Sequence, residues 1–392
     1  MGKALSKPRA TAGGRILSPY DEMLLRAVAS LGGFYNAHGH VDRADTLDAD
    51  YLAHVGTSPL EAAGLPLTVK QNLTGDLHLG RAYKEADLRA RMRRVIERLI
   101  GYGTAAFDTC VDVTPDIGED GMLAFRVASE LKTEFAKRIR IQLAPNPIFG
   151  FKKGTGRWEV FAKAAEQADF LSCLPEKDEI VEPHNSDGRV GFRPHIRMVM
   201  ELACKLRKPV HLHLDQANKP AEAGTETLLQ GLDWLDQPQI PDYQGPAVWV
   251  IHMISPSGYD EPRFRRLTEG LLKHNVGVIV CPTAAISMRQ LRPVQMPTHN
   301  SIARVLELCK LGIPVRLGSD NICDVFVPQG DGDMLTEIKM LGHAVRMPLP
   351  SVWAKLGAGH TLNQVDRATI GRWLWEDEKA FRSLDSAWHP AV

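Results

Sequence analysis

Histidine and acidic side chains stand at the ends of four short apolar runs that are spread along the chain. In chain order these ends are His38-Gly39-His40, His213-Leu214-Asp215-Gln216, His252 and Ser319-Asp320-Asn321. Neutral imidazoles and carboxylates are the usual protein ligands of catalytic divalent cations, and both can also carry protons. The residue types therefore predict metal-assisted hydrolysis, provided that the fold brings the four run ends together.

The spacing of the first histidine pair already fixes part of the geometry. Side chains alternate along a strand, so His38 and His40 project to the same face, where one cation could contact both imidazoles. His213 and the carboxylate of Asp320 would complete a site of three nitrogens and one oxygen, with a position left for water. His211 shares the face of His213 and stays an alternative ligand, but we favour His213 because His211 would lie one layer deeper.

One divalent cation is the cofactor that this set predicts, Zn²⁺ or Fe²⁺, with Mn²⁺ as an alternative. Such a cation lowers the pKa of its water from 15.7 toward roughly 7. Asp320 would accept the proton, and His252 would hold the hydroxide or stabilise the developing oxyanion. The fourth apolar run has no lysine that could be carboxylated to bridge two cations, which favours a mononuclear site.

Eight short runs rich in β-branched residues alternate with amphipathic stretches, the pattern of repeated βα units around a parallel sheet. We expect strands at 33–40, 104–108, 139–144, 170–174, 210–214, 248–252, 276–281 and 315–319. We expect helices at 85–100, 121–135, 157–168, 195–206, 226–235, 264–274, 302–311 and 334–345. The sequence thus predicts an α/β fold, a (β/α)8 TIM barrel with elaborated loops, in which active sites form at the carboxyl ends of the strands. A doubly wound open sheet is the alternative, but no GxGxxG follows any run.

The barrel accounts for most of the chain. We expect a flexible arm over residues 1–20, the barrel over residues 21–350, and a C-terminal helical extension packed on the barrel over residues 351–392. Helical periodicity covers 351–375, and the tail from Ser383 has no periodic pattern.

Charge and composition exclude several partner classes. Lys plus Arg and Asp plus Glu both number 47, so no net charge favours nucleic acid. No apolar stretch approaches the roughly 18 residues of a membrane helix, and the six cysteines stand singly. We expect a cytoplasmic enzyme with a small-molecule substrate, without nucleic-acid or membrane partners, that could form a homo-oligomer.

Four segments around these run ends resemble the amidohydrolase superfamily, and most closely its cytosine deaminase and N-isopropylammelide aminohydrolase branch. They read FYNAHGHVDRADT, VHLHLDQANKP, VWVIHMIS and LGSDNICDVFVPQGDGDM. The resemblance runs from about residue 33 to residue 345, and its most specific part is the GSDN-x-x-D stretch after the eighth run. It implies that His38, His40, His213 and Asp320 hold the metal.

Two departures from that branch are visible. Many of its deaminases carry Glu where this chain has Gln216, and an amide cannot shuttle a proton. The family's usual β-sandwich has no counterpart here, since the His-x-His pair stands at residue 38. We therefore expect a barrel without that domain.

Five polar residues are candidates to bind substrate. Asn146 and Gln216 could pair with the edge of a planar heterocycle, and Asn321 and Asp324 lie in the segment after the eighth strand. Lys70 stands beside Gln71 in a long loop that we expect to be solvated, and it would favour an anionic substrate if it turned inward.

Together with the metal-binding residues, the resemblance implies hydrolysis of a carbon–nitrogen bond. Hydrolytic deamination of an amino-substituted N-heterocycle is the leading interpretation. Opening of a cyclic amide or lactam, or another amidohydrolase reaction, is the first alternative. A metal-binding barrel with weakened catalysis is the second, and it is suggested only by Gln216.

Overall fold

The structure is a computed structural model that describes residues 17–179, 188–219, 221–287 and 302–388. Its strands are β1 (Phe34–Gly39), β2 (Thr104–Asp112), β3 (Arg140–Asn146), β4 (Leu171–Cys173), β5 (Val210–Leu214), β6 (Val248–His252), β7 (Val276–Val280) and β8 (Val315–Leu317). Each expected run overlaps one of these strands, and β2 and β3 continue beyond the expected ends at residues 108 and 144. The strands run parallel in the order β1-β2-β3 and β4-β5-β6-β7-β8.

Backbone hydrogen bonds join the two sheets at both seams. At one seam the N–H of Asp320, just after β8, donates to the carbonyl of His38 at 2.9 Å, and the N–H of His40 donates back to Asp320 at 3.3 Å. At the other, the N–H of Asp169, before β4, donates to the carbonyl of Leu143 at 2.8 Å. The eight strands therefore follow a ring, as the sequence predicts.

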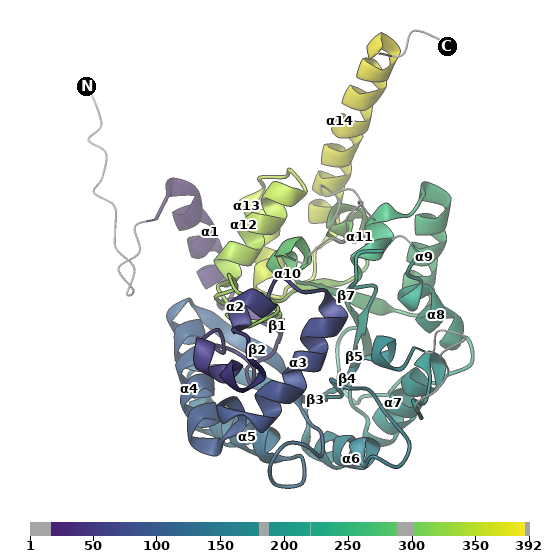
Figure 1. Cartoon of the computed structure of the whole chain (residues 1–392). Helices are drawn as coiled ribbons and strands as arrows, with labels where there is room; N and C mark the ends of the chain where they lie inside the picture. Colours follow the sequence, from purple (N-terminus) through teal and green to yellow (C-terminus); the bar gives the residue numbers. More distant parts are fainter. Residues whose placement is uncertain (1–16, 180–187, 220, 288–301, 389–392) are drawn as a thin grey trace, which may run out of the picture.

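Helices cover the outside of this ring (Figure 1). They are α1 (Pro19–Ser30), α2 (Pro59–Ala62), α3 (Leu67–Leu79), α4 (Glu85–Gly101), α5 (Leu123–Phe135), α6 (Arg157–Gln167), α7 (Phe192–Leu206), α8 (Gly224–Gly231), α9 (Glu261–Lys273), α10 (Pro282–Ser287), α11 (Val305–Leu311), α12 (Met334–Ala344), α13 (Pro350–Gly357) and α14 (Gln364–Trp388). The central strands are buried along their whole length because helices and barrel interior cover both faces. Within the described residues no β-sandwich accompanies the barrel.

Two expectations about helices are wrong in detail. The periodic stretch 351–375 holds two helices, because the backbone turns at Gly359, whose φ of 73° ends the first one. The second, α14, continues through Ser383 to Trp388 rather than ending before an irregular tail. Its beginning packs against α11, while its later turns extend away from the barrel (Figure 1).

The connection from β1 to α4 also differs from the expected loop. It contains α2, α3 and short 3₁₀ turns. Helix α3 lies across the ring end where the predicted site residues gather (Figure 1). In the described part of the chain, no helix has both the length and the apolar composition needed to cross a bilayer.

Candidate metal centre and pocket

Asp320 and the histidine pair of β1 meet at the carboxyl ends of β1 and β8. The Oδ1 atom of Asp320 lies 3.4 Å from Nε2 of His38 and 3.3 Å from Nε2 of His40. All three residues are buried. The structure thus brings together the two histidines that alternation placed on one face and the acidic residue at the end of the eighth strand.

Two further histidines complete the cluster. Nε2 of His213, on β5, faces Nε2 of His38 at 3.3 Å, and His252, at the end of β6, joins these two in a group whose ligand atoms lie within 4.8 Å of one another. The Nδ1 atom of His213 lies 3.3 Å from the carbonyl oxygen of Cys173, to which only an N–H can bond. This contact places the proton on Nδ1 and leaves the lone pair of Nε2 directed at the cluster.

His211, the alternative ligand, lies elsewhere. Its ring packs against Phe170 with ring centroids 4.3 Å apart, one layer deeper along β5. It belongs to neither group of ligand atoms found among the described residues.

Close backbone approach makes this convergence feasible. A Cβ at Gly318 would lie 2.8 Å from backbone and side-chain atoms of His38, so β8 can approach β1 this closely only with glycine there. His252 and Asp320 adopt left-handed conformations, with φ of 78° and 61°. Such conformations in non-glycine residues are costly and concentrate at functional sites.

The electrostatics of the cluster suit a cation. Burial is the main cause that lowers the pKa of His40 to about 3, that of His252 to about 4, and that of His213 well below its usual range. Burial opposes ionisation of Asp320, but contacts with His38 and His40 hold its pKa well below the ordinary value. Neutral imidazoles beside an ionised carboxylate are the protonation states that a metal ion requires. The residues present therefore fit a divalent cation.

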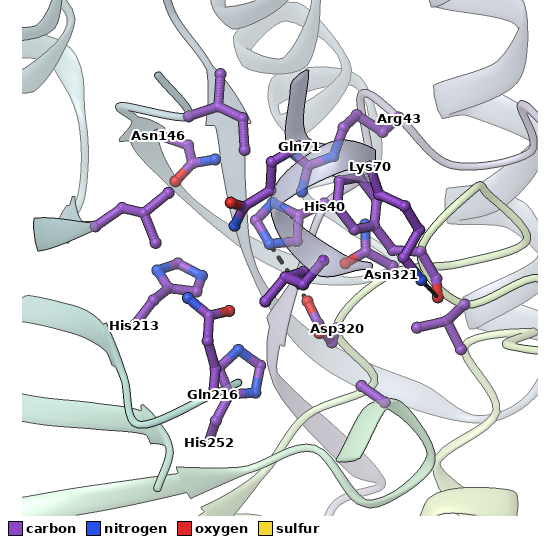
Figure 2. A pocket seen from close by; sticks show the side chains of 16 residues that line it. His40, Arg43, Lys70, Gln71, Asn146, His213, Gln216, His252, Asp320 and Asn321 are labelled. Carbon is purple, nitrogen blue, oxygen red and sulfur yellow. Dashed lines mark hydrogen bonds and ion pairs between the residues drawn. The ribbon is translucent and has the colours of Figure 1, made fainter. Parts of the chain in front are cut away.

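A pocket opens above the cluster. Figure 2 shows His40, His213, His252 and Asp320 at its floor, with Asn146, Gln216, Asn321, Lys70 and Gln71 around them. Four of the five predicted substrate-binding residues thus line one cavity. Asp324 does not line it. Its Oδ1 accepts the N–H groups of Phe326 and Val327 at 2.9 and 3.0 Å, which fixes the loop after β8.

The expectation of a solvated loop at Lys70 and Gln71 is wrong. Both lie on α3 and are buried, with exposed fractions of 2% and 6%. The Nζ atom of Lys70 donates to the carbonyls of Ala63 and Phe326, both at 3.3 Å. Burial lowers the pKa of this ammonium group. Helix α3 therefore places the ammonium group of Lys70 at the pocket wall.

Sequence reasoning missed a buried ionic network beside the pocket. Arg43 lines the cavity, and its Nη1 lies 3.0 Å from both carboxylate oxygens of Asp112. His78 contacts the same carboxylate at 3.2 Å, and Tyr83 donates to the neighbouring Asp42 at 2.7 Å. The available signal was Asp112 itself, which ends β2 four residues after the expected end of that run.

Comparisons with solved structures agree with this architecture. The 5-methylcytosine deaminase of Klebsiella pneumoniae with phosphonocytosine is similar with a TM-score of 0.66, at 22% identity, over 87% of this chain and 82% of that one. The N-isopropylammelide isopropylaminohydrolase of Burkholderia multivorans gives a TM-score of 0.60 at 19% identity, over 83% and 73% of the two chains. This chain shares the fold of these two enzymes.

Weaker and less informative similarities complete the comparison. The guanine deaminase of C. acetobutylicum is similar in fold with a TM-score of 0.53 at 14% identity, over 85% of this chain and 75% of that one. An uncharacterized protein of Haemophilus influenzae is 28% identical over 278 residues, which are 71% of this chain and 90% of that protein. No family model matches the chain. At these identities the structural likeness establishes the fold alone.

Proposed function

We propose that the protein is a metal-dependent hydrolase that cleaves a carbon–nitrogen bond, by hydrolytic deamination of an amino-substituted N-heterocycle. The observation that carries this proposal is the convergence of His38, His40, His213, His252 and Asp320, of which all but His38 line a pocket walled by amide side chains. The similarity in fold to the two deaminases and the aminohydrolase named above supports it.

His38, His40, His213 and Asp320 would hold one divalent cation, Zn²⁺ or Fe²⁺, with Mn²⁺ as an alternative. When bound, the cation supplies a water acidic enough to ionise near neutral pH. Three imidazoles and one carboxylate are nitrogen and oxygen donors that these divalent cations accept.

The remaining chemistry falls to two side chains of the cluster. Asp320 reaches the pocket with its side chain 10% exposed, and it is ionised, so it can take the proton of the attacking water. It would then return that proton to the leaving nitrogen, whose departure as a neutral amine requires it. His252 would donate a hydrogen bond to the oxygen on which charge develops.

Lys70 indicates a polar or anionic group on the substrate. An ammonium group has three N–H donors, and the two protein carbonyls that Lys70 contacts use two of them. The third could bond a substrate oxygen. A ring that carries an oxo group or a carboxylate would satisfy it.

Metal analysis followed by an ammonia-release screen tests the proposal. The purified protein, prepared without chelators, is analysed for bound metal and incubated with aminopyrimidines, aminotriazines and pterins. Stoichiometric metal with release of ammonia from one class is the expected result. Ring opening without ammonia would indicate lactam hydrolysis instead, and bound metal with no turnover of any ring would contradict a hydrolase.

A further inference from the structure

Glu176, a residue of the 3₁₀ turn η4 (Pro175–Asp178) after β4, lies directly behind Gln216. Its Oε2 accepts a hydrogen bond from Nε2 of Gln216 at 2.8 Å, and its Oε1 accepts one from the N–H of Asp215 at 2.6 Å. Nε2 of Gln216 is the donor of this pair, so the amino end of its amide faces Glu176. Within the described part of the chain no hydrogen bond reaches Oε1 of Gln216, and this oxygen is left for the pocket.

The turn that carries Glu176 is itself held in place. Asp178 accepts a hydrogen bond from the N–H of Phe151 at 2.8 Å and contacts Nδ1 of His195 at 2.6 Å. Nε2 of His195 in turn accepts the N–H of Leu174 at 3.3 Å. These buried contacts fix both ends of η4, so Glu176 is positioned before any ligand arrives.

The other two amides of the pocket are anchored in the same way. Nδ2 of Asn146 donates to Asp112 at 2.7 Å, and Nδ2 of Asn321 donates to Asp324 at 2.5 Å. The carbonyl of Asn146 also accepts from Ser172 at 3.2 Å, which leaves it one further lone pair. In each case a buried carboxylate binds the amino end of the amide.

We propose that Glu176 is a positioning residue that fixes the carbonyl oxygen of Gln216 as the hydrogen-bond acceptor for a ring N–H of the substrate. This inference rests on the proposed function, because it assumes that the pocket receives a nitrogen heterocycle. It accounts for the amide at position 216, since a glutamate there would face the carboxylate of Glu176 at hydrogen-bond distance.

Nearby charges make a glutamate at position 216, beside Glu176, still less favourable. Burial, together with the carboxylates of Glu222 and Asp215, raises the pKa of Glu176, and the two hydrogen bonds that it accepts oppose this rise. Replacing the Gln216 donor with an acid would remove one of those bonds and add a further carboxylate.

Exchange of the two side chains provides the test. In the double variant Glu176→Gln/Gln216→Glu, the new amide can donate to one oxygen of the new carboxylate, whose other oxygen still presents an acceptor to the pocket. We expect each single variant to bind uracil about tenfold more weakly than the wild type, because an oriented hydrogen bond is lost. The double variant should recover to within about threefold. Calorimetry on metal-loaded protein measures these affinities.

A second ring separates positioning from general structural damage. Uracil has two ring N–H donors, and 1,3-dimethyluracil has none. The wild type should bind uracil more tightly than 1,3-dimethyluracil, because only uracil can donate a ring N–H to Gln216. In Glu176→Gln the Gln216 amide is no longer oriented, so this difference in affinity between the two rings should become smaller while the metal content stays unchanged. The proposal is overturned if Glu176→Gln leaves that ratio intact, or if the losses of the two single variants simply multiply in the double variant.

Failure of the proposed function would look different. If the wild type binds neither ring and releases no ammonia from any heterocycle, the substrate class assigned above is wrong. Thermal unfolding of the same variants then tests whether Glu176 and Gln216 interact as a pair. If they do, the double variant must melt at a higher temperature than Gln216→Glu alone. Equal melting temperatures would mean that Glu176 and Gln216 do not act as a pair.

Discussion

Replacing His213 with Asn should abolish tight metal binding, whereas the same change at His211 should leave it intact. The two residues are two positions apart on β5 and are both buried, which makes them a matched pair. Only His213 places a ring nitrogen against His38, at 3.3 Å, with its proton held by the carbonyl of Cys173. His211 packs on Phe170 instead.

The size of the effect follows from what each imidazole contacts. Loss of a group that merely orients a metal ligand costs about 10- to 100-fold in metal affinity. Loss of the His213 ligand itself should therefore cost at least about 100-fold, which corresponds to roughly 2.7 kcal/mol. His211→Asn removes a buried ring and should reduce the free energy of unfolding by about 0.5–3 kcal/mol without lowering the affinity for the metal.

Metal content after dialysis and Zn²⁺ titration against a competing chromophoric chelator measure both variants. Melting temperatures with and without added metal supply a second readout, because a ligand that binds only the folded state stabilises it. The reasoning is refuted if His211→Asn loses the metal while His213→Asn keeps it. Equal losses in two folded variants would refute it as well.

Three further predictions concern the pocket and its surroundings. Asp320→Asn should lower kcat by about 10²- to 10⁴-fold while the protein retains part of its bound metal, since an amide ligates weakly but accepts no proton. If kcat and metal content fell equally, Asp320 would be only a ligand. Lys70→Met should lower kcat/KM for rings that carry an oxo or carboxylate group by about 10- to 100-fold, the worth of a charge-assisted hydrogen bond, and should leave rings without such a group unaffected in the same assay. Burial raises the pKa of Glu337 to about 8 from an ordinary value near 4.5, so the free energy of unfolding should fall as pH rises from about 4.5 to 8; Glu337→Gln should flatten that fall in denaturant titrations at pH 5 and pH 8, and an unchanged slope would contradict the assignment.

The architecture could be predicted because it depends on periodic patterns. Every expected strand overlaps an observed one, since a strand buried on both faces reads as a continuous apolar run. The position of His38, His40 and Asp320 at strand ends follows from alternation and from the barrel's polarity. Strand ends were less predictable. The strand β2 continues four residues beyond the expected end, to Asp112, whose carboxylate belongs to a buried ionic network.

Part of the pocket wall escaped prediction for a different physical reason. Lys70 lies in a segment without strong amphipathic periodicity, yet tertiary packing buries it on α3, and Glu176 reaches Gln216 across two strand ends that are 40 residues apart in sequence. Pairings of this kind depend on the three-dimensional placement of loops, which local patterns do not encode. The ligand cluster belongs to the strands and is visible in the sequence, whereas the groups that orient a substrate belong to the loops. For that reason the candidate metal ligands could be predicted before the structure, whereas the pairing of Gln216 with Glu176 could not.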